Sequence, residues 1–310
     1  MSPDSSHSDS LQRFIFENSP VRGNIVRLNQ TFNTALQHQN CPPALRKALG
    51  ELMAAAALLA ATLKMQGALV LQIQGNGALK LLVVECTAEL TLRATAKWTE
   101  NLIKDDLADT DFADSNFAEL VGDGQFVITL DPKDGGQGYQ GIVQLEGNSI
   151  AEVLQNYMQR SEQIETRIWL ACDNQTAAGM LLQKLPDFQS TDLPEQDADL
   201  WERTGYLANT MRQDELLHVP AEDLLLRLFH EETVRLFDAQ PVKFHCTCSR
   251  TSVGSMLRLL GAPEVTDILE DNGDVEVHCD FCNAAYVFDK VDVEQLFSAD
   301  IMMPSTNSKH

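Results

Sequence analysis

The fold of the C-terminal part is decided by HCTC at residues 245–248 and, thirty residues further on, by CDFC at residues 279–282. These two motifs contain four of the chain's seven cysteines. Four thiolates about 2.3 Å from the metal form a common tetrahedral ligand set for zinc. We therefore predict one zinc ion per chain in the reduced form, bound by Cys246, Cys248, Cys279 and Cys282.

Two alternatives concern the same motifs. The four cysteines could form two structural disulfides, an arrangement typical of secreted proteins. His245 and His278 each precede a ligand cysteine and could replace one of them, but we interpret both as neighbours of the site. A site with four cysteine ligands has no open position for water or substrate. We therefore expect a structural or regulatory metal, no catalytic residue and no enzymatic activity.

The same site can respond to oxidants. Zinc-bound cysteines are thiolates, which are the species that oxidants attack, and each pair is close enough in sequence to form a disulfide. Zinc contributes about 10–16 kcal/mol to the folding of zinc-finger peptides. A segment of this size has little apolar core of its own, so loss of the zinc ion should unfold it.

Length and charge limit the number of domains and the kinds of partner. A chain of 310 residues, 44% of them hydrophobic, is long enough for two domains, or for one large and one small domain. Its net charge is −22, from 23 basic and 45 acidic residues, which disfavours nucleic acid as a partner. No Walker loop occurs in residues 11–185, so we expect no nucleotide either.

The N-terminus and the cysteine usage predict a cytoplasmic protein. Residues 1–10 lack the basic and apolar regions of a signal peptide, and the apolar run at residues 52–63 is too short to span a membrane. Cysteines in the cytosol are kept reduced, which favours a metal site over standing disulfides. We interpret Cys41, Cys86 and Cys172, which match no motif, as ordinary buried or half-buried thiols.

The hydrophobic patterning predicts an α+β protein with a mixed, mainly antiparallel sheet domain, a helical linker and a small C-terminal zinc domain. The expected divisions are a disordered N-terminus at residues 1–10, an α+β core at 11–185, a helical linker region at 186–240, a zinc domain at 241–298 and a disordered tail at 299–310.

The linker region carries two predicted helices, at residues 198–211 and 221–237, in which apolar and acidic residues alternate. One interpretation is an amphipathic connector that packs on the core. The other is a metastable segment that docks in one state and frees its apolar face in another. This apolar face, and the sheet surface it covers, are the candidate surfaces for binding other proteins.

Further motifs accompany the cysteines along nearly the whole chain. They are Arg13-Phe14, Val21-Arg22-Gly23, Ser161-Glu162-Gln163, LLQKLP at residues 181–186, FHEE at residues 229–232, and Ser249-Arg250 after the first cysteine pair. With these motifs the chain resembles the redox-regulated heat-shock holdases of bacteria, the family of the 33-kilodalton zinc chaperonin.

The resemblance implies an ATP-independent chaperone that binds unfolding proteins under oxidative and heat stress. It would be inactive while reduced and zinc-bound. Oxidation would form the disulfides Cys246–Cys248 and Cys279–Cys282, release the zinc ion and loosen the linker, and the active form would be a homodimer.

Three other hypotheses compete with this one. A zinc ribbon that acts on nucleic acid is disfavoured by the negative charge. A thiol–disulfide oxidoreductase would need its CxxC at a helix start in a thioredoxin-like unit, whereas the residues around 279–282 predict a hairpin. The third is a purely structural zinc site in a protein whose function lies in the N-terminal domain.

Overall fold

The computed structural model describes residues 9–37, 39, 41–63, 66–99, 117–133, 136–186 and 199–298. The chain divides into two compact units, Met1–His245 and Cys246–His310. The predicted α+β class, with mainly antiparallel sheets, is confirmed. The predictions made for residues 1–8, for the start of the linker at 187–198 and for the tail from residue 299 lie outside the described residues.

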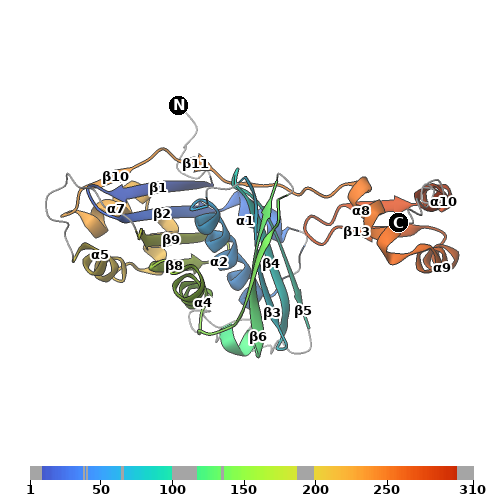
Figure 1. Cartoon of the computed structure of the whole chain (residues 1–310), viewed down its shortest axis with the longest axis horizontal. Coiled ribbons are helices and arrows are strands. Elements are labelled where there is room, and N and C mark those ends of the chain that lie inside the picture. Colours follow the sequence, from blue (N-terminus) through green and yellow to red (C-terminus); the bar gives the residue numbers. More distant parts are fainter. Residues whose placement is uncertain are drawn as a thin grey trace, which may run out of the picture. The chain divides into compact units, whose positions relative to one another are not determined.

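The first sheet of the larger unit joins strands from both ends of that unit (Figure 1). Its order is β10-β1-β2-β9-β8, β11 pairs with the start of β1, and every pair is antiparallel. The strands are β1 Ser10–Phe16, β2 Val21–Leu28, β8 Thr166–Cys172, β9 Ala177–Lys184, β10 Val234–Leu236 and β11 Gln240–Pro241.

The second sheet has the order β12-β5-β4-β3-β6-β7. All its pairs are antiparallel except that between β12 and β5, which is parallel. Its strands are β3 Gly67–Gly75, β4 Leu79–Thr87, β5 Thr91–Trp98, β6 Gly124–Pro132, β7 Tyr139–Gln144 and β12 Lys243–Phe244.

Helix α2, Pro43–Ala60, is the centre of the larger unit because it packs against strands of both sheets (Figure 1). Its C-terminal half is a run of alanine and leucine that is almost entirely buried. Small side chains are needed where a helix is enclosed by two sheets. A Cβ atom at Gly50 would lie 2.4 Å from Sγ of Cys172, so only glycine fits at this point of contact.

Three shorter elements complete this layer: α1 Gln30–Leu36, α3 Phe117–Val121 and α4 Ile150–Tyr157, which continues as a π-helical turn, η4 Met158–Glu162. Ser149 caps α4 by accepting a hydrogen bond from the backbone N–H of Glu152. None of the helices in the described part of the chain combines the length and the hydropathy of a membrane span.

The N-terminal boundary differs from the expected one. Residues 1–10 were expected to be disordered, but Asp9 is buried and Ser10 begins β1. The carboxylate of Asp9 accepts hydrogen bonds from the backbone N–H groups of Asn29 and Gln30, at 2.7 and 3.1 Å. These are unpaired donors at the N-terminus of α1, where a negative charge is stabilised.

Helices from the predicted linker cover the second face of the first sheet. They are α5 Leu200–Ala208, α6 Gln213–His218 and α7 Ala221–Phe229. Their buried leucine and aromatic residues form one cluster with those of β1, β2, β8 and β9. The ring of Phe229 lies 5.1 Å from that of Phe16 and 6.4 Å from that of Phe14. The first interpretation of the linker, a connector packed on the core, therefore describes this structure.

The end of the linker differs from its prediction. The helix expected at 221–237 stops at Phe229, and residues 234–236 form β10 instead, because β1 offers a free edge that pairs with them. The expected start of the zinc domain, residue 241, also falls inside the larger unit. Val242 is buried in its core, and the N–H groups of Lys243 and His245 donate to Leu90 and Leu92 of the second sheet.

The described part of the smaller unit, up to residue 298, consists of a two-stranded hairpin and three helices. They are β13 Val275–His278, β14 Ala285–Phe288, α8 Arg250–Leu260, α9 Ala262–Asn272 and α10 Lys290–Ser298. Ser249 is the N-cap of α8 and Gly261 follows its last residue, and both residue types favour these positions. Helix α9 was not predicted, although Pro263 in its first turn is a helix-start signal.

Helices α5–α7 form a helical cover on the first sheet. Replacement of Phe229 by alanine tests whether this ring holds the cover in place. The change leaves a cavity among the rings of Phe14 and Phe16, and we expect it to cost about 3–5 kcal/mol in the stability of the cover. Hydrogen exchange of α5–α7 measures the loss. Leu226 of the same helix is 66% exposed, so Leu226→Ala is the matched control. Equal protection of α5–α7 from hydrogen exchange in the two variants would contradict this role of Phe229.

Candidate metal centre

The two cysteine pairs are presented by two different kinds of backbone. Cys246 and Cys248 lie in an extended segment that ends at Ser249, the N-cap of α8. Cys279 and Cys282 lie in the turn between β13 and β14, as the sequence predicted. The turn is closed by hydrogen bonds from the N–H of Cys279 to the carbonyl of Ala284 and from the N–H of Asn283 to the carbonyl of Cys279.

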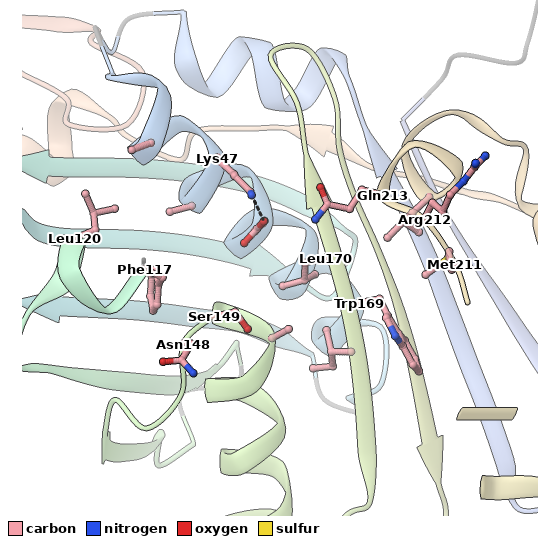
Figure 2. Close-up of a pocket in the computed structure, with 16 residues that line it drawn as sticks. Lys47, Phe117, Leu120, Asn148, Ser149, Trp169, Leu170, Met211, Arg212 and Gln213 are labelled. Atoms are coloured by element: carbon pink, nitrogen blue, oxygen red, sulfur yellow. Dashed lines mark ion pairs between the residues drawn. The ribbon is translucent and has the colours of Figure 1, made fainter. Parts of the chain in front are cut away.

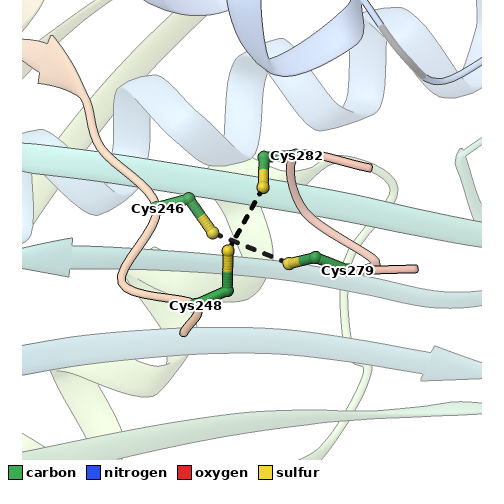
Figure 3. A group of neighbouring side chains, drawn as sticks. All are labelled: Cys246, Cys248, Cys279 and Cys282. Carbon is green, nitrogen blue, oxygen red and sulfur yellow. Dashed lines mark hydrogen bonds between the residues drawn. The ribbon is translucent and has the colours of Figure 1, made fainter. Parts of the chain in front are cut away.

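The structure brings all four predicted cysteines together, with their Sγ atoms within 4.8 Å of one another. Figure 3 shows two sulfur–sulfur hydrogen bonds, each of which joins cysteines of different pairs: Cys246 and Cys279 at 3.7 Å, and Cys248 and Cys282 at 3.4 Å. Ligands about 2.3 Å from a tetrahedral zinc ion are separated by roughly 3.8 Å. The four sulfurs therefore have the spacing and the chemistry for a tetrahedral metal ion with a high affinity for thiolates.

The two neighbouring histidines are not part of this cluster. Within the described residues, the group of side chains able to hold a metal here consists of the four cysteines. The ring of His278 instead lies 3.0 Å from a carboxylate oxygen of Glu276 and is exposed. The interpretation of both histidines as neighbours agrees with this geometry.

The protonation of the cluster opposes metal binding. Burial, reinforced by hydrogen bonds with the neighbouring thiols, raises the pKa of Cys282 to about 12. Without a metal, this thiol therefore keeps its proton at neutral pH. A metal ion must displace the proton to bind the thiolate, so metal affinity should rise as pH rises.

Tyr286 is a participant that the sequence reasoning missed. Its hydroxyl on β14 donates a hydrogen bond to Sγ of Cys248, at 3.1 Å. This bond with Cys248 is the main cause that raises the pKa of Tyr286 to about 12, so the hydroxyl remains a donor at neutral pH. The only available signal was period-2 alternation, which places Tyr286 on the opposite face of β14 from the two flanking residues.

The smaller unit has a limited apolar core. Its cluster of buried residues contains Val253, Leu257, Val265, Val275, Phe288, Val293 and Leu296. Arg250 adds a contact from α8, because its guanidinium stacks 4.3 Å from the ring of Phe288 and pairs with Asp292 at 2.6 Å. A core of this size contributes little stability, so the unit depends on what binds its cysteines.

The other three cysteines lie apart from the cluster, in the larger unit. Cys41 and Cys86 are buried and Cys172 is half-buried, as predicted. Burial raises the pKa of Cys41 to about 12 and raises the pKa values of Cys86 and Cys172 further. They are therefore protonated thiols of low reactivity at neutral pH.

The larger unit contains a cavity of about 400 Å³, between α2, α3, α4, α6 and β8 (Figure 2). Lys47 and Glu51 of α2 face it as an ion pair with 4.0 Å between Nζ and Oε1. Burial raises the pKa of Glu51 to about 7, partly offset by the charge of Lys47. Mixed apolar and polar residues line the remainder, including Leu170, Met211 and Gln213. If the function lay in the N-terminal domain alone, this cavity would be its candidate site.

Comparison with known proteins adds evidence over the whole chain. The family model described as Hsp33 protein matches residues 9–289. The 33 kDa chaperonin of Methylobacillus flagellatus is 59% identical over 304 residues, which cover 98% of this chain and 99% of the relative. The 33 kDa chaperonin of Chromobacterium violaceum is 47% identical over 306 residues, again with coverage of 98% and 99%.

A solved structure also has the same fold. The crystal structure of the 33 kDa chaperonin from Thermotoga maritima superposes with a TM-score of 0.78 at 23% sequence identity. The alignment covers 95% of this chain and 99% of that chain. At this identity the likeness is one of fold.

Replacement of Tyr286 by phenylalanine tests its role at the cluster. Loss of a hydrogen bond to a ligand atom weakens metal affinity by about 10–100-fold in well-studied sites, and we expect a loss at the lower end of this range. Competition with a chromogenic zinc chelator measures the affinity. Tyr206→Phe is the control, because Tyr206 lies on α5 and is 71% exposed. Unchanged affinity in the Tyr286 variant would rule out this role.

Proposed function

Because this chain belongs to the Hsp33 family, we propose that it is a redox-regulated, ATP-independent chaperone of the holdase type. In this proposal, a zinc ion bound by Cys246, Cys248, Cys279 and Cys282 keeps the protein inactive in the reduced cytoplasm. Oxidation of the cysteines releases the zinc ion and activates the protein, which then binds unfolding proteins as a homodimer without nucleotide. The observation that carries the proposal is the convergence of the four thiols in a unit with little core of its own.

The oxidation step needs an external two-electron oxidant for each disulfide. Two thiolates lose two electrons and form one S–S bond, while a peroxide takes up the two electrons and two protons and leaves as water and an alcohol, or as two waters. A disulfide sulfur is a far weaker zinc ligand than a thiolate, so each step removes two ligands. After both steps the zinc ion has no ligand set.

The disulfides we propose are Cys246–Cys248 and Cys279–Cys282, although the sulfur–sulfur hydrogen bonds in the structure join Cys246 with Cys279 and Cys248 with Cys282. Chain connectivity supports this choice. Partners two or three residues apart stay close together after the unit unfolds, whereas partners separated by 33 or 34 residues move apart. Formation of the proposed bonds is therefore compatible with unfolding of the smaller unit.

Unfolding of the smaller unit can act on the larger one through the chain that joins them. Residues 240–245 directly precede Cys246 and are paired along β1 and β5. When the metal no longer orders Cys246, these short strands lose an anchored end. Loosening would then extend to α5–α7, whose removal would expose the apolar face of the first sheet. This face is the surface we propose for unfolding proteins.

Zinc release and chaperone activity should appear together. We expect one zinc ion per chain to leave as the reduced protein is oxidised with peroxide at raised temperature, while suppression of the aggregation of a thermally unfolding client rises in parallel. A metal-binding dye and light scattering follow the two events. Cys172→Ala is the control, because Cys172 lies outside the cluster and should leave both events unchanged.

Two outcomes would favour the alternative of a purely structural zinc site. One is zinc release without any suppression of aggregation. The other is full suppression while the zinc ion is still bound. Either result would direct attention to the cavity beside Lys47 and Glu51.

The two disulfides should form in a fixed order. A CxxC pair closes a relaxed small ring, whereas a CxC pair closes a tighter and more strained one, and strain makes a disulfide easier to reduce. We expect Cys279–Cys282 to form before Cys246–Cys248. Peptide mapping by mass spectrometry along a peroxide time course measures the order. A complete Cys246–Cys248 disulfide while Cys279 and Cys282 are still reduced would show that the order is the opposite.

A further inference from the structure

Two arginines of the larger unit face a second cavity, of about 340 Å³. Arg13 lies on β1 and Arg22 on β2. In the register of these strands, Arg13 is opposite Asn24 and Arg22 is opposite Ile15. The two arginines are therefore diagonal neighbours on the same face of the first sheet. Both belong to motifs, Arg13-Phe14 and Val21-Arg22-Gly23, for which the proposed switch provides no role.

The positive charge of this pair is not balanced by a salt bridge. Within the described residues, neither guanidinium forms an ion pair with a carboxylate. Eight other arginines do form such pairs: Arg93, Arg160, Arg167, Arg203, Arg212, Arg227, Arg235 and Arg250. Arg27, Arg46 and Arg258 likewise form no ion pair among the described residues, but Arg13 and Arg22 lie on one face of the sheet and line the same cavity.

Arg22 is held in place by a neutral partner. Its Nε and Nη2 atoms both donate to Oε1 of Gln183, at 3.2 and 2.8 Å. Gln183 is fully buried and is itself positioned by Thr166, to which its Nε2 donates at 3.3 Å. Only two of the five N–H groups of Arg22 are used by this bond, so three remain for a ligand.

The two charges also act on each other. Burial lowers the pKa of Arg22, and the nearby charge of Arg13 lowers it further. A guanidinium nevertheless stays protonated at neutral pH, so the repulsion persists until an anion offsets it. Among the described residues that line the cavity, Asp238 is the one acidic residue, and it forms no ion pair with either arginine.

We propose that this cavity binds an oxyanion of the phosphate class, with Arg13 and Arg22 as its charged donors. Two guanidinium groups with several free N–H donors match the charge and the several acceptor oxygens of a phosphate. The volume is sufficient for a pyrophosphate or a small phosphate monoester. The proposal concerns the reduced, resting protein and stands independently of the redox switch.

Binding at this site would also hold one part of the chain. Two residues that line the same cavity belong to this part: Phe237, which directly follows β10, and Gln240, the first residue of β11. The N–H of Phe237 donates to the carbonyl of Arg13 at 2.9 Å. A ligand that bridges the arginines should therefore protect the backbone of residues 237–240 from hydrogen exchange.

Calorimetric titration of the reduced, zinc-loaded full chain tests the proposal. The ligands are inorganic phosphate and pyrophosphate, with ionic strength held constant by sodium chloride, and succinate serves as a dicarboxylate for comparison. We expect saturable binding that is tightest for pyrophosphate. Arg13→Gln should weaken it at least tenfold, and Asp238→Asn should strengthen it about threefold by removing a repelling carboxylate. Arg160→Gln is the charge-matched control, because Arg160 is exposed on η4 and does not line the cavity.

Arg13 is exposed, so its variant should fold as the wild type does. Arg22→Lys is a second variant, which keeps the charge but loses the two-atom contact with Gln183 and should also bind more weakly. Equal affinity of the wild type and Arg13→Gln for pyrophosphate would overturn the proposal. A titration with pyrophosphate that releases no more heat than a titration with sodium chloride would also overturn it. Succinate binding as tight as pyrophosphate binding would overturn the assignment to phosphate. Hydrogen exchange with and without pyrophosphate checks the predicted protection of residues 237–240.

Discussion

The smaller unit depends on the grouping of four thiols at one point. Their Sγ atoms lie within 4.8 Å of one another, although the two pairs are separated along the chain by α8, α9 and β13. The apolar core of this unit is a cluster of seven buried residues. Metal binding by thiolates can contribute a large part of the folding free energy of a unit with so small a core.

The larger unit has the opposite character, because its stability comes from buried apolar surface on both faces of one sheet. Helix α2 covers one face permanently, between two sheets. Helices α5–α7 cover the other face, and they come from a stretch that the sequence alone marks as a connector. Each large apolar side chain buried there contributes about 1.5–3 kcal/mol. If the cover were removed, these apolar side chains would be exposed to solvent.

Polar contacts make that cover specific. Arg27 of β2 donates to the carbonyls of Leu216 and Val219 at the end of α6, the first at 3.0 Å. Arg167 of β8 donates to the carbonyl of Trp201 at 3.2 Å and pairs with Glu202 of α5. The carbonyls at the C-terminal end of α6 have no intrahelical partner, and Arg27 from the sheet satisfies them. The cover therefore has a defined docked position on the first sheet.

The sequence by itself determined the α+β class, the hairpin around Cys279 and Cys282, the helix capped by Ser249 and the identity of the four clustered cysteines. These features depend on local signals: alternation, capping residues and the short spacing of soft ligands. Other features depended on contacts between distant residues, which no local pattern encodes. Residues 234–236 are a strand because β1 has a free edge beside them, and Asp9 is ordered because α1 presents unpaired N–H groups to it. Tyr286 reaches Cys248, and Arg13 reaches the same cavity as Arg22, only once strands are paired in register. Tertiary structure alone decided these points, since strand register and edge pairing are set by the partner strand as much as by the segment itself.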